Sequence, residues 1–375
     1  MVLPDLKSSD LHWLARRVFL ETSGYRLRPK FQPDYVPDPD ASWYEERATH
    51  TRGAIMDATR ISDERPVILK SVSTRMHPHE VKIARLFSSP PLAENPRNHC
   101  VPIFDVLQDP EDADKQIIVM PRLIEMDRPL FETVGEVVDC FRQIFEGVEF
   151  MHDNFVAHRD CWGPNIAQDP TLLFPWGFHP VYTTQDPANL RPASHIARTF
   201  CWPRYFIIDF GLSRRYDPFG GPPLEPVIRG GDRSPPEHHK HPLVCNPFPT
   251  DIYFLGNFLK QDFLLSRWAG KKRMPVPSLR FLEGLINDMT QEDPSLRPTI
   301  GEVIERFDVL CSSLTQWHLR RPGQKYAFHL GLFFSQVNRT LRCIPPIPRY
   351  QPRMDRVPLS QLMREFFTQT PSVMK

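Results

Sequence analysis

Two short stretches decide how this 375-residue chain is interpreted: DNFVAHRDCWGPNI at residues 153–166 and YFIIDFGLS at residues 205–213. In the first, Asp160 follows a His-Arg pair and precedes Asn165, in a loop that a glycine and a proline interrupt. In the second, a short apolar run predicts a buried strand that ends at Asp209, and a glycine follows where the chain can turn. The sequence therefore predicts two carboxylates and one amide at the ends of short elements.

These three side chains suit phosphoryl transfer. One carboxylate can accept a proton from an attacking hydroxyl, while the other carboxylate and the amide oxygen can hold Mg²⁺. Catalysis of this reaction is mostly positioning and electrostatic stabilisation. Upstream, Lys70 in the run PVILKSV offers a cation for phosphates, and Glu80 on the following helix can hold that lysine by an ion pair.

The region from Arg52 to Met120 predicts a small antiparallel sheet. Its four short apolar runs, GAIMDA, PVILKSV, VPIFDVL and QIIVM, are typical of strands, and HEVKIARLF predicts one helix between the second and the third. Beyond residue 124 the apolar spacing becomes helical, and helices are predicted at 134–152, 251–265 and 278–290. Residues 1–44 begin with an amphipathic pattern and continue into a Pro/Asp-rich segment, so we interpret them as an N-terminal extension.

In this order, the motifs resemble those of eukaryotic-type protein kinases, which carry a strand lysine, an H-R-D-x-x-x-x-N loop and D-F-G. RNHCVPIFDVL, VMPRL, FMHDNFVAHRD and DIYFLGN resemble, more narrowly, a divergent group of fungal kinase-like proteins. The resemblance implies an α+β, bilobal fold. It places a small antiparallel sheet with one helix in an N-lobe at 45–123 and a larger, mainly helical C-lobe at 124–310, which carries an insertion at about 168–204. A Pro-rich tail follows at 311–375.

The resemblance also implies roles for single residues. Asp160 would accept or orient the substrate proton, and Lys70 would contact the phosphates of ATP with Glu80 locking it. Asn165 and Asp209 would hold Mg²⁺. The residues implied around ATP are Ile55, Ile68, Lys70, Glu80, Met120, Pro121, Leu123 and Ala167. The residues implied to be structural are His158, Arg159, Phe210, Gly211, Glu237, Asp251 and Arg297. Of these, Glu237 and Arg297 would pair, and Asp251 would brace the catalytic loop.

The chain departs from the kinase pattern near its site. Ala48 and His50 stand where the first two glycines of a glycine-rich loop belong, which predicts weaker contact between loop amides and phosphates. Trp162 replaces the lysine of the catalytic loop, and Gly230 replaces the threonine that bonds that lysine in Ser/Thr kinases. The spacing from Lys70 to Glu80 is also short for the family.

Two further segments bear on regulation. Arg159 before the catalytic aspartate usually implies control by phosphorylation of the activation segment. Between the D-F-G and P-P-E motifs, however, the only hydroxyl side chains are Ser213, Tyr216 and Ser234. We therefore expect the segment to be held by its own prolines and glycines. The insertion lies near the catalytic cleft in sequence, and we expect it to bind substrate or to cover the site.

The function predicted from these features is a protein kinase that uses ATP and Mg²⁺ to phosphorylate a protein hydroxyl, with Ser/Thr favoured over Tyr. The alternative is a pseudokinase, a nucleotide-binding or scaffold module with little or no turnover, because the glycine-rich loop and the catalytic-loop lysine are missing. The core polar residues all remain, which favours the enzyme. Nothing in the sequence specifies the protein substrate.

Composition limits the classes of partner that this chain is expected to bind. With 46 basic and 45 acidic side chains, the net charge of +1 lacks the basic excess that nucleic-acid binding needs. No apolar run approaches the ~20 residues of a membrane span. The seven scattered cysteines and the lack of a secretory signal pattern predict an intracellular location, cytoplasmic or nuclear. The 41 prolines are abundant in both tails, which are candidate sites for scaffold partners.

Overall fold

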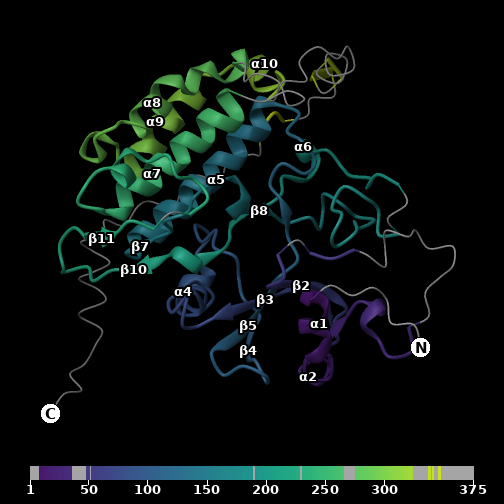
Figure 1. Ribbon diagram of the computed structural model, residues 1–375. Coiled ribbons are helices and arrows are strands. Elements are labelled where there is room, and N and C mark those ends of the chain that lie inside the picture. Colours follow the sequence, from purple (N-terminus) through teal and green to yellow (C-terminus); the bar gives the residue numbers. More distant parts are fainter. Residues whose placement is uncertain are drawn as a thin grey trace.

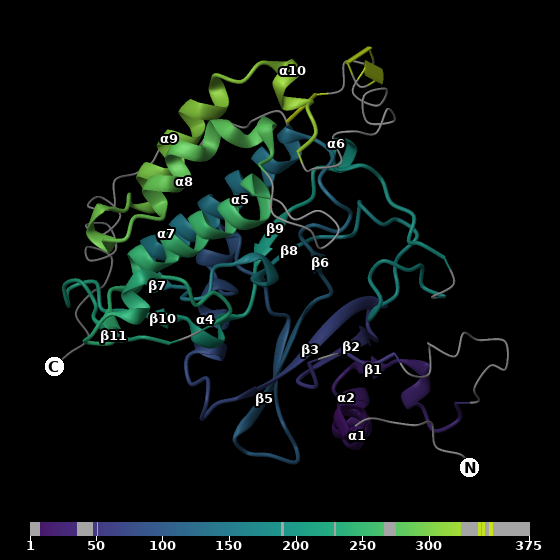
Figure 2. The same cartoon turned by 45° about the horizontal axis from the view of Figure 1, so that its top comes forward.

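A computed structural model describes residues 8–35, 48–50, 52–188, 191–228, 230–265 and 275–323, and parts of 337–347 (337–338, 340–341 and 345–347). The described chain forms two lobes, one built on an antiparallel sheet and one mainly helical (Figures 1 and 2). The predicted α+β, bilobal kinase-like fold is therefore confirmed. The segments 36–47 and 348–375 lie outside the described residues, and with them the end of the predicted Pro-rich tail.

The small lobe is a five-stranded antiparallel sheet with the order β1-β2-β3-β5-β4. The strands are β1 (Tyr25–Leu27), β2 (Ile55–Arg60), β3 (Arg65–Ser73), β4 (Asp105–Gln108) and β5 (Lys115–Pro121). In this register Lys70 lies opposite Ile55 on one side and Ile118 on the other, at the centre of the sheet. The helix α4 (Glu80–Phe87) follows β3 and packs Val81 against Val72 and Ile118.

The N-terminal residues belong to this sheet. The sequence analysis assigned residues 1–44 to an extension, but β1 pairs with β2 and was not among the expected strands. The helices α1 (Ser8–Ala15) and α2 (Arg17–Thr22) and the 3₁₀ turn η1 (Pro29–Phe31) surround β1. Trp13 is fully buried in an apolar cluster that also contains Leu69 and Val119 of the central strands. The sheet thus gains an edge strand and a covered face from residues that precede the predicted lobe.

Three small sheets position the loops between the lobes. The strands β6 (Ile124–Glu125), β8 (Ile166–Gln168) and β9 (Tyr205–Ile207) form one of them. The other two pair β7 (Val156–Ala157) with β10 (Arg214–Arg215) and β11 (Glu225–Pro226) with β12 (Val244–Cys245). Short 3₁₀ turns follow several of these strands: η3 (Gly163–Asn165), η4 (Phe210–Leu212) and η5 (Pro236–His239). The turn η2 (Leu92–Glu94) lies between α4 and β4.

The large lobe is built around α5 (Val134–Asp153), where a helix was expected at 134–152. Thr133 and Glu136 form a capping box at its start, which satisfies backbone N–H groups that the helix itself leaves unpaired. Its buried stripe packs against α9 (Ile300–Ser312), and Phe145 meets Phe307 edge-on with ring centroids 5.2 Å apart. Most of the helix outside this stripe is buried as well, since α5 also contacts β7 and β9.

The remaining expected helices are less regular than the apolar pattern suggested. The helix predicted at 251–265 starts earlier, as α7 (Pro247–Phe258), and continues as the π-helical turn η6 (Leu259–Leu264). The helix predicted at 278–290 divides into the 3₁₀ segment η7 (Pro277–Leu282) and α8 (Glu283–Met289). The 3₁₀ turn η8 (Pro294–Leu296) and the short helix α10 (Gln316–Leu319) complete the described part of this lobe.

The insertion at 168–204 packs beside the small sheet between the lobes. It contains one short helix, α6 (Arg198–Cys201), among its described residues. Leu173, Phe174 and Phe178 form an apolar cluster with Ile124 of β6. The insertion is therefore anchored to the chain segment that joins the two lobes (Figure 2).

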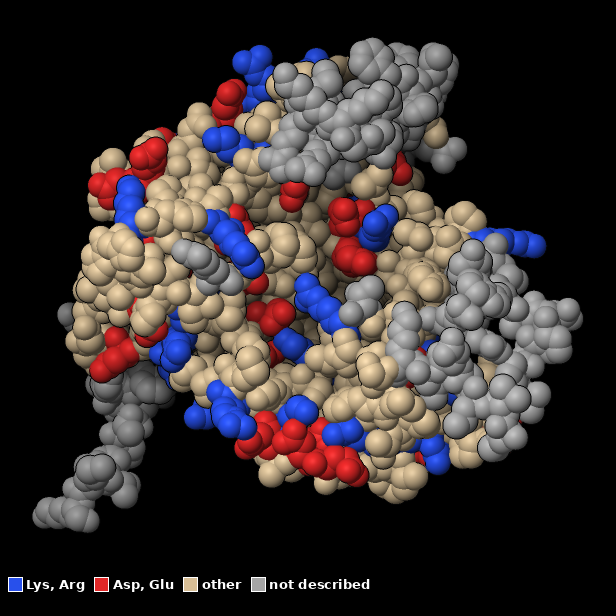
Figure 3. Space-filling model, in the orientation of Figure 1, with Lys and Arg blue, Asp and Glu red and all other residues tan. Residues whose placement is uncertain are grey.

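No helix among the described residues is both long and apolar enough to cross a membrane. On the face shown in Figure 3, Lys and Arg side chains lie among Asp and Glu side chains, so that this face shows no broad field of one charge. The six cysteines in the described ranges are all free thiols.

Trp13→Ala is expected to destabilise the protein by about 3–5 kcal/mol, because it leaves a cavity against the central strands and removes an indole hydrogen bond to the Gly53 carbonyl. Urea unfolding measures the loss. Leu11→Ala on the exposed side of the same helix is the control and should stay within about 0.5 kcal/mol of wild type. Equal effects of the two substitutions would show that α1 is not part of the small-lobe core.

Asp139 predicts a pH dependence of stability. Burial raises the pKa of this α5 carboxyl to about 7, although Gln143 donates a hydrogen bond to it. The unfolded chain therefore ionises first as the pH rises from about 4 to 7, and the wild type loses stability over that range. Asp139→Asn should be more stable than wild type, with an advantage that grows by about 2 kcal/mol between pH 5 and pH 8. An advantage that is the same at both pH values in urea unfolding would contradict this account.

Candidate active site

Lys70 joins three separate elements. From the middle of β3, its Nζ lies 2.5 Å from Glu80 Oε1 and 2.8 Å from Asp209 Oδ1. Glu80 reaches Lys70 despite the short spacing in sequence, because Glu80 is the first residue of α4 and no helical turn separates it from the connection after β3. The structure therefore brings together residues that are 139 positions apart in sequence.

The charges of this cluster stabilise one another. Burial by itself would lower the pKa of Lys70, but Glu80 and Asp209 outweigh it and hold that pKa above its usual value. Burial would raise the pKa of Asp209, yet Lys70 outweighs it and holds that pKa below its usual value. Lys70 therefore stays a cation and Asp209 stays an anion at neutral pH.

Asp160 and Asn165 lie close together in the catalytic loop. The Asn165 Nδ2 donates to the Asp160 backbone oxygen at 2.9 Å and to its Oδ2 at 2.8 Å. The other carboxylate oxygen of Asp160 accepts the Gly231 N–H at 2.8 Å. A carboxylate can accept about four hydrogen bonds. Asp160 is half-buried and keeps capacity for a further donor, such as a substrate hydroxyl.

Asp251 of α7 holds the backbone of this loop from behind. Its fully buried carboxylate accepts the N–H of His158 at 2.8 Å and the N–H of Arg159 at 2.7 Å. Arg159 has φ of +68°, a conformation that non-glycine residues rarely adopt without external support. The His158 ring is also buried and donates from Nε2 to the Ile208 carbonyl at 3.1 Å. The Asp251 bonds therefore attach the catalytic loop to α7, and the His158 bond links it to the residue before Asp209.

The backbone after β9 turns sharply at Asp209, whose φ is +66°. Its Oδ1 accepts the Gly211 N–H at 3.2 Å, and the Gly211 carbonyl accepts from the His77 ring at 2.9 Å. Phe210 is buried between Phe87 of α4 and the His158 ring. The D-F-G segment thus contacts both lobes within three residues.

A cavity of about 370 Å³ opens next to Lys70 and Asp209. This volume lies in the range of small-molecule sites. Its apolar walls come from β2, β3, the segment after β5 and the β8–β9 region. The predicted ATP-binding residues that line it are Ile55, Ile68, Lys70, Met120, Pro121, Leu123 and Ala167. Glu80 does not line it and acts on it only through Lys70.

Trp162 and the activation segment occupy the space around Asp160 differently from the kinase pattern. A Cβ on Gly230 would lie 2.3 Å from Asp160 Oδ1, and one on Gly231 would lie 2.0 Å from the Trp162 ring. Both positions therefore require glycine. The backbone N–H of Gly231 donates to Asp160, and the Trp162 ring packs beside Gly231. Trp162 and the two glycines are therefore neighbours next to Asp160.

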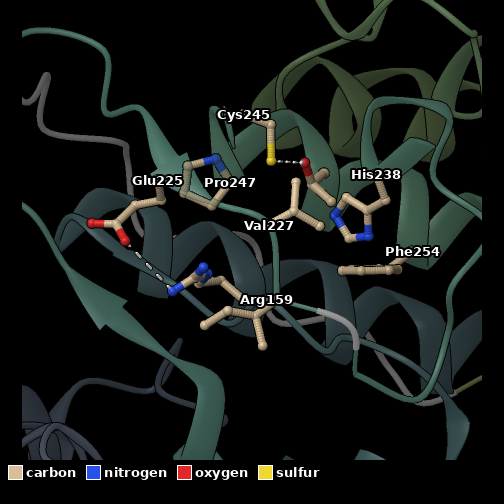
Figure 4. A pocket seen from close by; sticks show the side chains of 9 residues that line it. Arg159, Glu225, Val227, His238, Cys245, Pro247 and Phe254 are labelled. Carbon is tan, nitrogen blue, oxygen red and sulfur yellow. Dashed lines mark hydrogen bonds and ion pairs between the residues drawn. The ribbon is translucent and has the colours of Figure 1, made fainter. Parts of the chain in front are cut away.

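The Arg159 side chain contacts a carboxylate of the activation segment, that of Glu225. Its Nη1 lies 3.9 Å from Glu225 Oε2 (Figure 4), and its Nη2 donates to the Pro226 carbonyl at 2.9 Å. Arg214 of β10 approaches the same carboxylate at 3.6 Å. Both arginines thus share one acidic side chain, which supplements the prolines and glycines that were expected to hold the segment.

Glu237 and Arg297 form a buried bidentate ion pair, with both N–O distances at 2.7 Å. Burial raises the pKa of Glu237, but Arg297 outweighs it, so the pKa lies below its usual value. Thr250 of α7 donates to the same carboxylate at 2.8 Å. The end of the activation segment is therefore attached to α7 and to the turn before α9.

Some residues at the cavity were not singled out from the sequence. Arg52 precedes β2, and Pro180 and Thr183 come from the insertion. Thr183 Oγ1 donates to Glu125 Oε2 at 3.1 Å, so that the insertion forms one wall of the cavity mouth. The expectation that the insertion lies near the cleft was the only sequence signal for these contacts.

No family model matches the chain. In a comparison with curated proteins, it is 25% identical over 238 residues to the serine/threonine protein kinases OSK3 and OSK4 of rice, Oryza sativa. The chain is similar to Ser/Thr protein kinases. The match covers 60% of this chain but only 40% of each rice protein, so the chain spans less than half the length of these relatives. This distant similarity agrees with the kinase-like fold and supports the kinase superfamily; it shows no link to the fungal group.

Glu237→Gln is expected to destabilise the fold by about 3 kcal/mol, because it leaves the Arg297 guanidinium buried without its counter-charge. Chemical unfolding at neutral pH provides the measurement. The exposed pair between Arg306 and Asp288 is a matched control, and Asp288→Asn should cost less than about 1 kcal/mol. A loss for Glu237→Gln no larger than that of the control would mean that the buried pair does not hold the segment.

Proposed function

We propose that this chain binds ATP with Mg²⁺ and transfers the γ-phosphate to a hydroxyl of a protein substrate, of the Ser/Thr class. The observation that carries the proposal is the double contact of Lys70 with Glu80 and Asp209 beside the cavity. Asp160 and Asn165, which do not line the cavity themselves, are bonded to each other on the loop whose Pro164 and Ile166 do line it. A fixed cation, a metal-binding carboxylate and a proton acceptor are the parts that phosphoryl transfer uses. The distant similarity to rice Ser/Thr kinases favours the Ser/Thr class.

The residues present fit Mg²⁺ bound together with phosphates. No group of three His, Cys, Asp or Glu side chains in the described ranges is arranged to hold a metal by itself. Mg²⁺ commonly takes only one or two protein ligands and completes its shell with phosphates and water. The Asn165 nitrogen is used toward Asp160, which leaves its amide oxygen for a cation. Asp209 Oδ2 accepts no short hydrogen bond from the described residues. Bound there, Mg²⁺ would neutralise phosphate charge.

The proposed roles follow from the contacts. Lys70 would bind phosphate oxygens while Glu80 keeps it in place. Asp160, aligned by Asn165 and Gly231, would accept or orient the proton of the substrate hydroxyl. The activation segment, attached by Glu237 and Arg297, would form the surface on which a protein substrate docks. An intracellular setting and partners for the Pro-rich tails remain part of this proposal.

A second candidate is a pseudokinase that binds nucleotide with little turnover. The replacement of the catalytic-loop lysine by Trp162 favours it, because a lysine at that position would stabilise charge on the transferred phosphate. In addition, the Gly231 N–H donates to the Asp160 oxygen that could otherwise face substrate. Nucleotide binding is common to both candidates, and turnover separates them.

The test is a Mg²⁺-ATP turnover assay on the full chain with a generic protein substrate and autophosphorylation as readouts. Asp160→Asn and Asp209→Asn should each lower turnover by a factor of about 10² or more, since each removes a charge that acts directly on the reaction. Asp63→Asn, on an exposed turn of the small lobe, is the control and should leave turnover unchanged. Turnover that survives both site substitutions would refute the enzyme. Nucleotide binding detected by calorimetry without any turnover would favour the pseudokinase.

A further inference from the structure

Arg52 lines the same cavity as Lys70 and Asp209, from the loop that precedes β2. Its Nη1 lies 3.9 Å from Asp209 Oδ2, while Lys70 holds the other oxygen of that carboxylate at 2.8 Å. The Arg52 side chain is 62% exposed, in contrast to 17% for Lys70. Asp209 therefore lies between one buried, fixed cation and one exposed cation at the cavity mouth.

The other basic side chains that line this cavity are committed elsewhere. The His50 Nε2 lies 2.8 Å from Asp57 Oδ1. Arg122 is stacked over the Phe178 ring at 4.8 Å, and burial lowers its pKa. Lys70 has two carboxylate partners. Among the described residues of the cavity wall, Arg52 is the cation with the loosest attachment, since its ion pair is long and exposed.

The loop that carries Arg52 is held by the N-terminal segment. The Ala48 carbonyl accepts from Lys30 Nζ at 2.8 Å and from Arg28 Nη2 at 3.1 Å. The Gly53 carbonyl accepts from the Trp13 indole at 3.0 Å. These bonds restrain the backbone on both sides of Arg52. A restrained loop with few glycines cannot close its amides around phosphates as a flexible glycine-rich loop does. Any contact between this loop and phosphates must therefore come from a side chain and not from backbone amides.

The charge balance of the cleft calls for such a contact. Lys70 is the buried cation of the cleft and faces the carboxylates of both Glu80 and Asp209. A nucleoside triphosphate adds further negative charge to the same space. An arginine binds phosphate through two parallel N–H groups, which gives stronger and more directional contacts than a single ammonium. Arg52 has the exposure and the position to turn toward such a ligand.

We propose that Arg52 is a phosphate-binding residue of this site, which exchanges Asp209 for the phosphates of a bound nucleoside triphosphate. Its guanidinium replaces, with a side chain, the backbone amides of a glycine-rich loop. The exchange also releases the Asp209 oxygen that the proposed function assigns to Mg²⁺. The assignment rests on that proposed nucleotide site.

The experiment is isothermal titration calorimetry on the full chain with ATP, ADP and adenosine, in Mg²⁺ at fixed ionic strength. Arg52→Gln should weaken ATP binding about ten-fold, which is the scale of one charge-assisted contact. The same substitution should weaken ADP binding less and leave adenosine binding unchanged, because only the phosphates contact the guanidinium. The affinity of Arg52→Lys for ATP should lie between those of Arg52→Gln and wild type. Arg65→Gln, at the exposed start of β3, is the matched control and should bind all three ligands as wild type does.

Each outcome decides the assignment. ATP binding by Arg52→Gln that equals or exceeds that of wild type overturns the role of Arg52, although the nucleotide site stands. Equal weakening for ATP and adenosine also overturns it, since that pattern indicates a disturbed cavity. A wild-type chain that binds neither ATP nor adenosine overturns both this assignment and the proposed function. Melting temperatures of the variants, expected to equal that of wild type, show that the fold is retained.

Discussion

The Nζ atom of Lys70 lies between two carboxylates that come from different parts of the chain, and the arrangement of the two lobes depends on this contact. Glu80 begins the helix of the small lobe, and Asp209 ends a strand of the sheet between the lobes. Removing Lys70 would leave the Glu80 and Asp209 carboxylates without the cation that they share, at a cost of several kcal/mol. The cluster therefore aligns β3, α4 and the D-F-G segment, and it places the cavity between them.

The loop that precedes β2 beside that cavity is restrained by hydrogen bonds, in contrast to a flexible glycine-rich loop. Flexible glycines let a loop close on a ligand, but each of them costs conformational entropy when it is ordered. Here the loop is held by hydrogen bonds from Lys30, Arg28 and Trp13, all of which precede it in the N-terminal segment. The N-terminal residues are thus part of the site's architecture, since they build one edge of the sheet and restrain the loop above the cavity.

The activation segment is attached at three places by direct contacts. Glu225 lies against Arg159 and Arg214, Gly231 donates to Asp160, and Glu237 pairs with Arg297. Of its three hydroxyl side chains, Ser213 is buried and donates to the His158 carbonyl, which leaves it unsuited to modification in this conformation. These contacts order the segment with carboxylates and backbone groups that the sequence itself supplies.

Residue patterns alone were sufficient to predict the fold class and the order of the polar motifs, because apolar spacing indicates buried faces and because the site residues stand in short, ordered motifs. The apolar pattern did not predict β1, because a strand of three residues is too short to show a period. It also predicted continuous helices at 251–265 and 278–290, where the structure has an α-helix followed by a π-helical turn and a 3₁₀ segment followed by an α-helix. Only the tertiary structure decided which distant residues meet: Trp13 with Gly53, Arg159 with Glu225, and Thr183 with Glu125. These partners lie in or beside loops whose backbone has no repeating geometry. Their positions follow from the packing of the surrounding elements, which no local pattern of residues encodes.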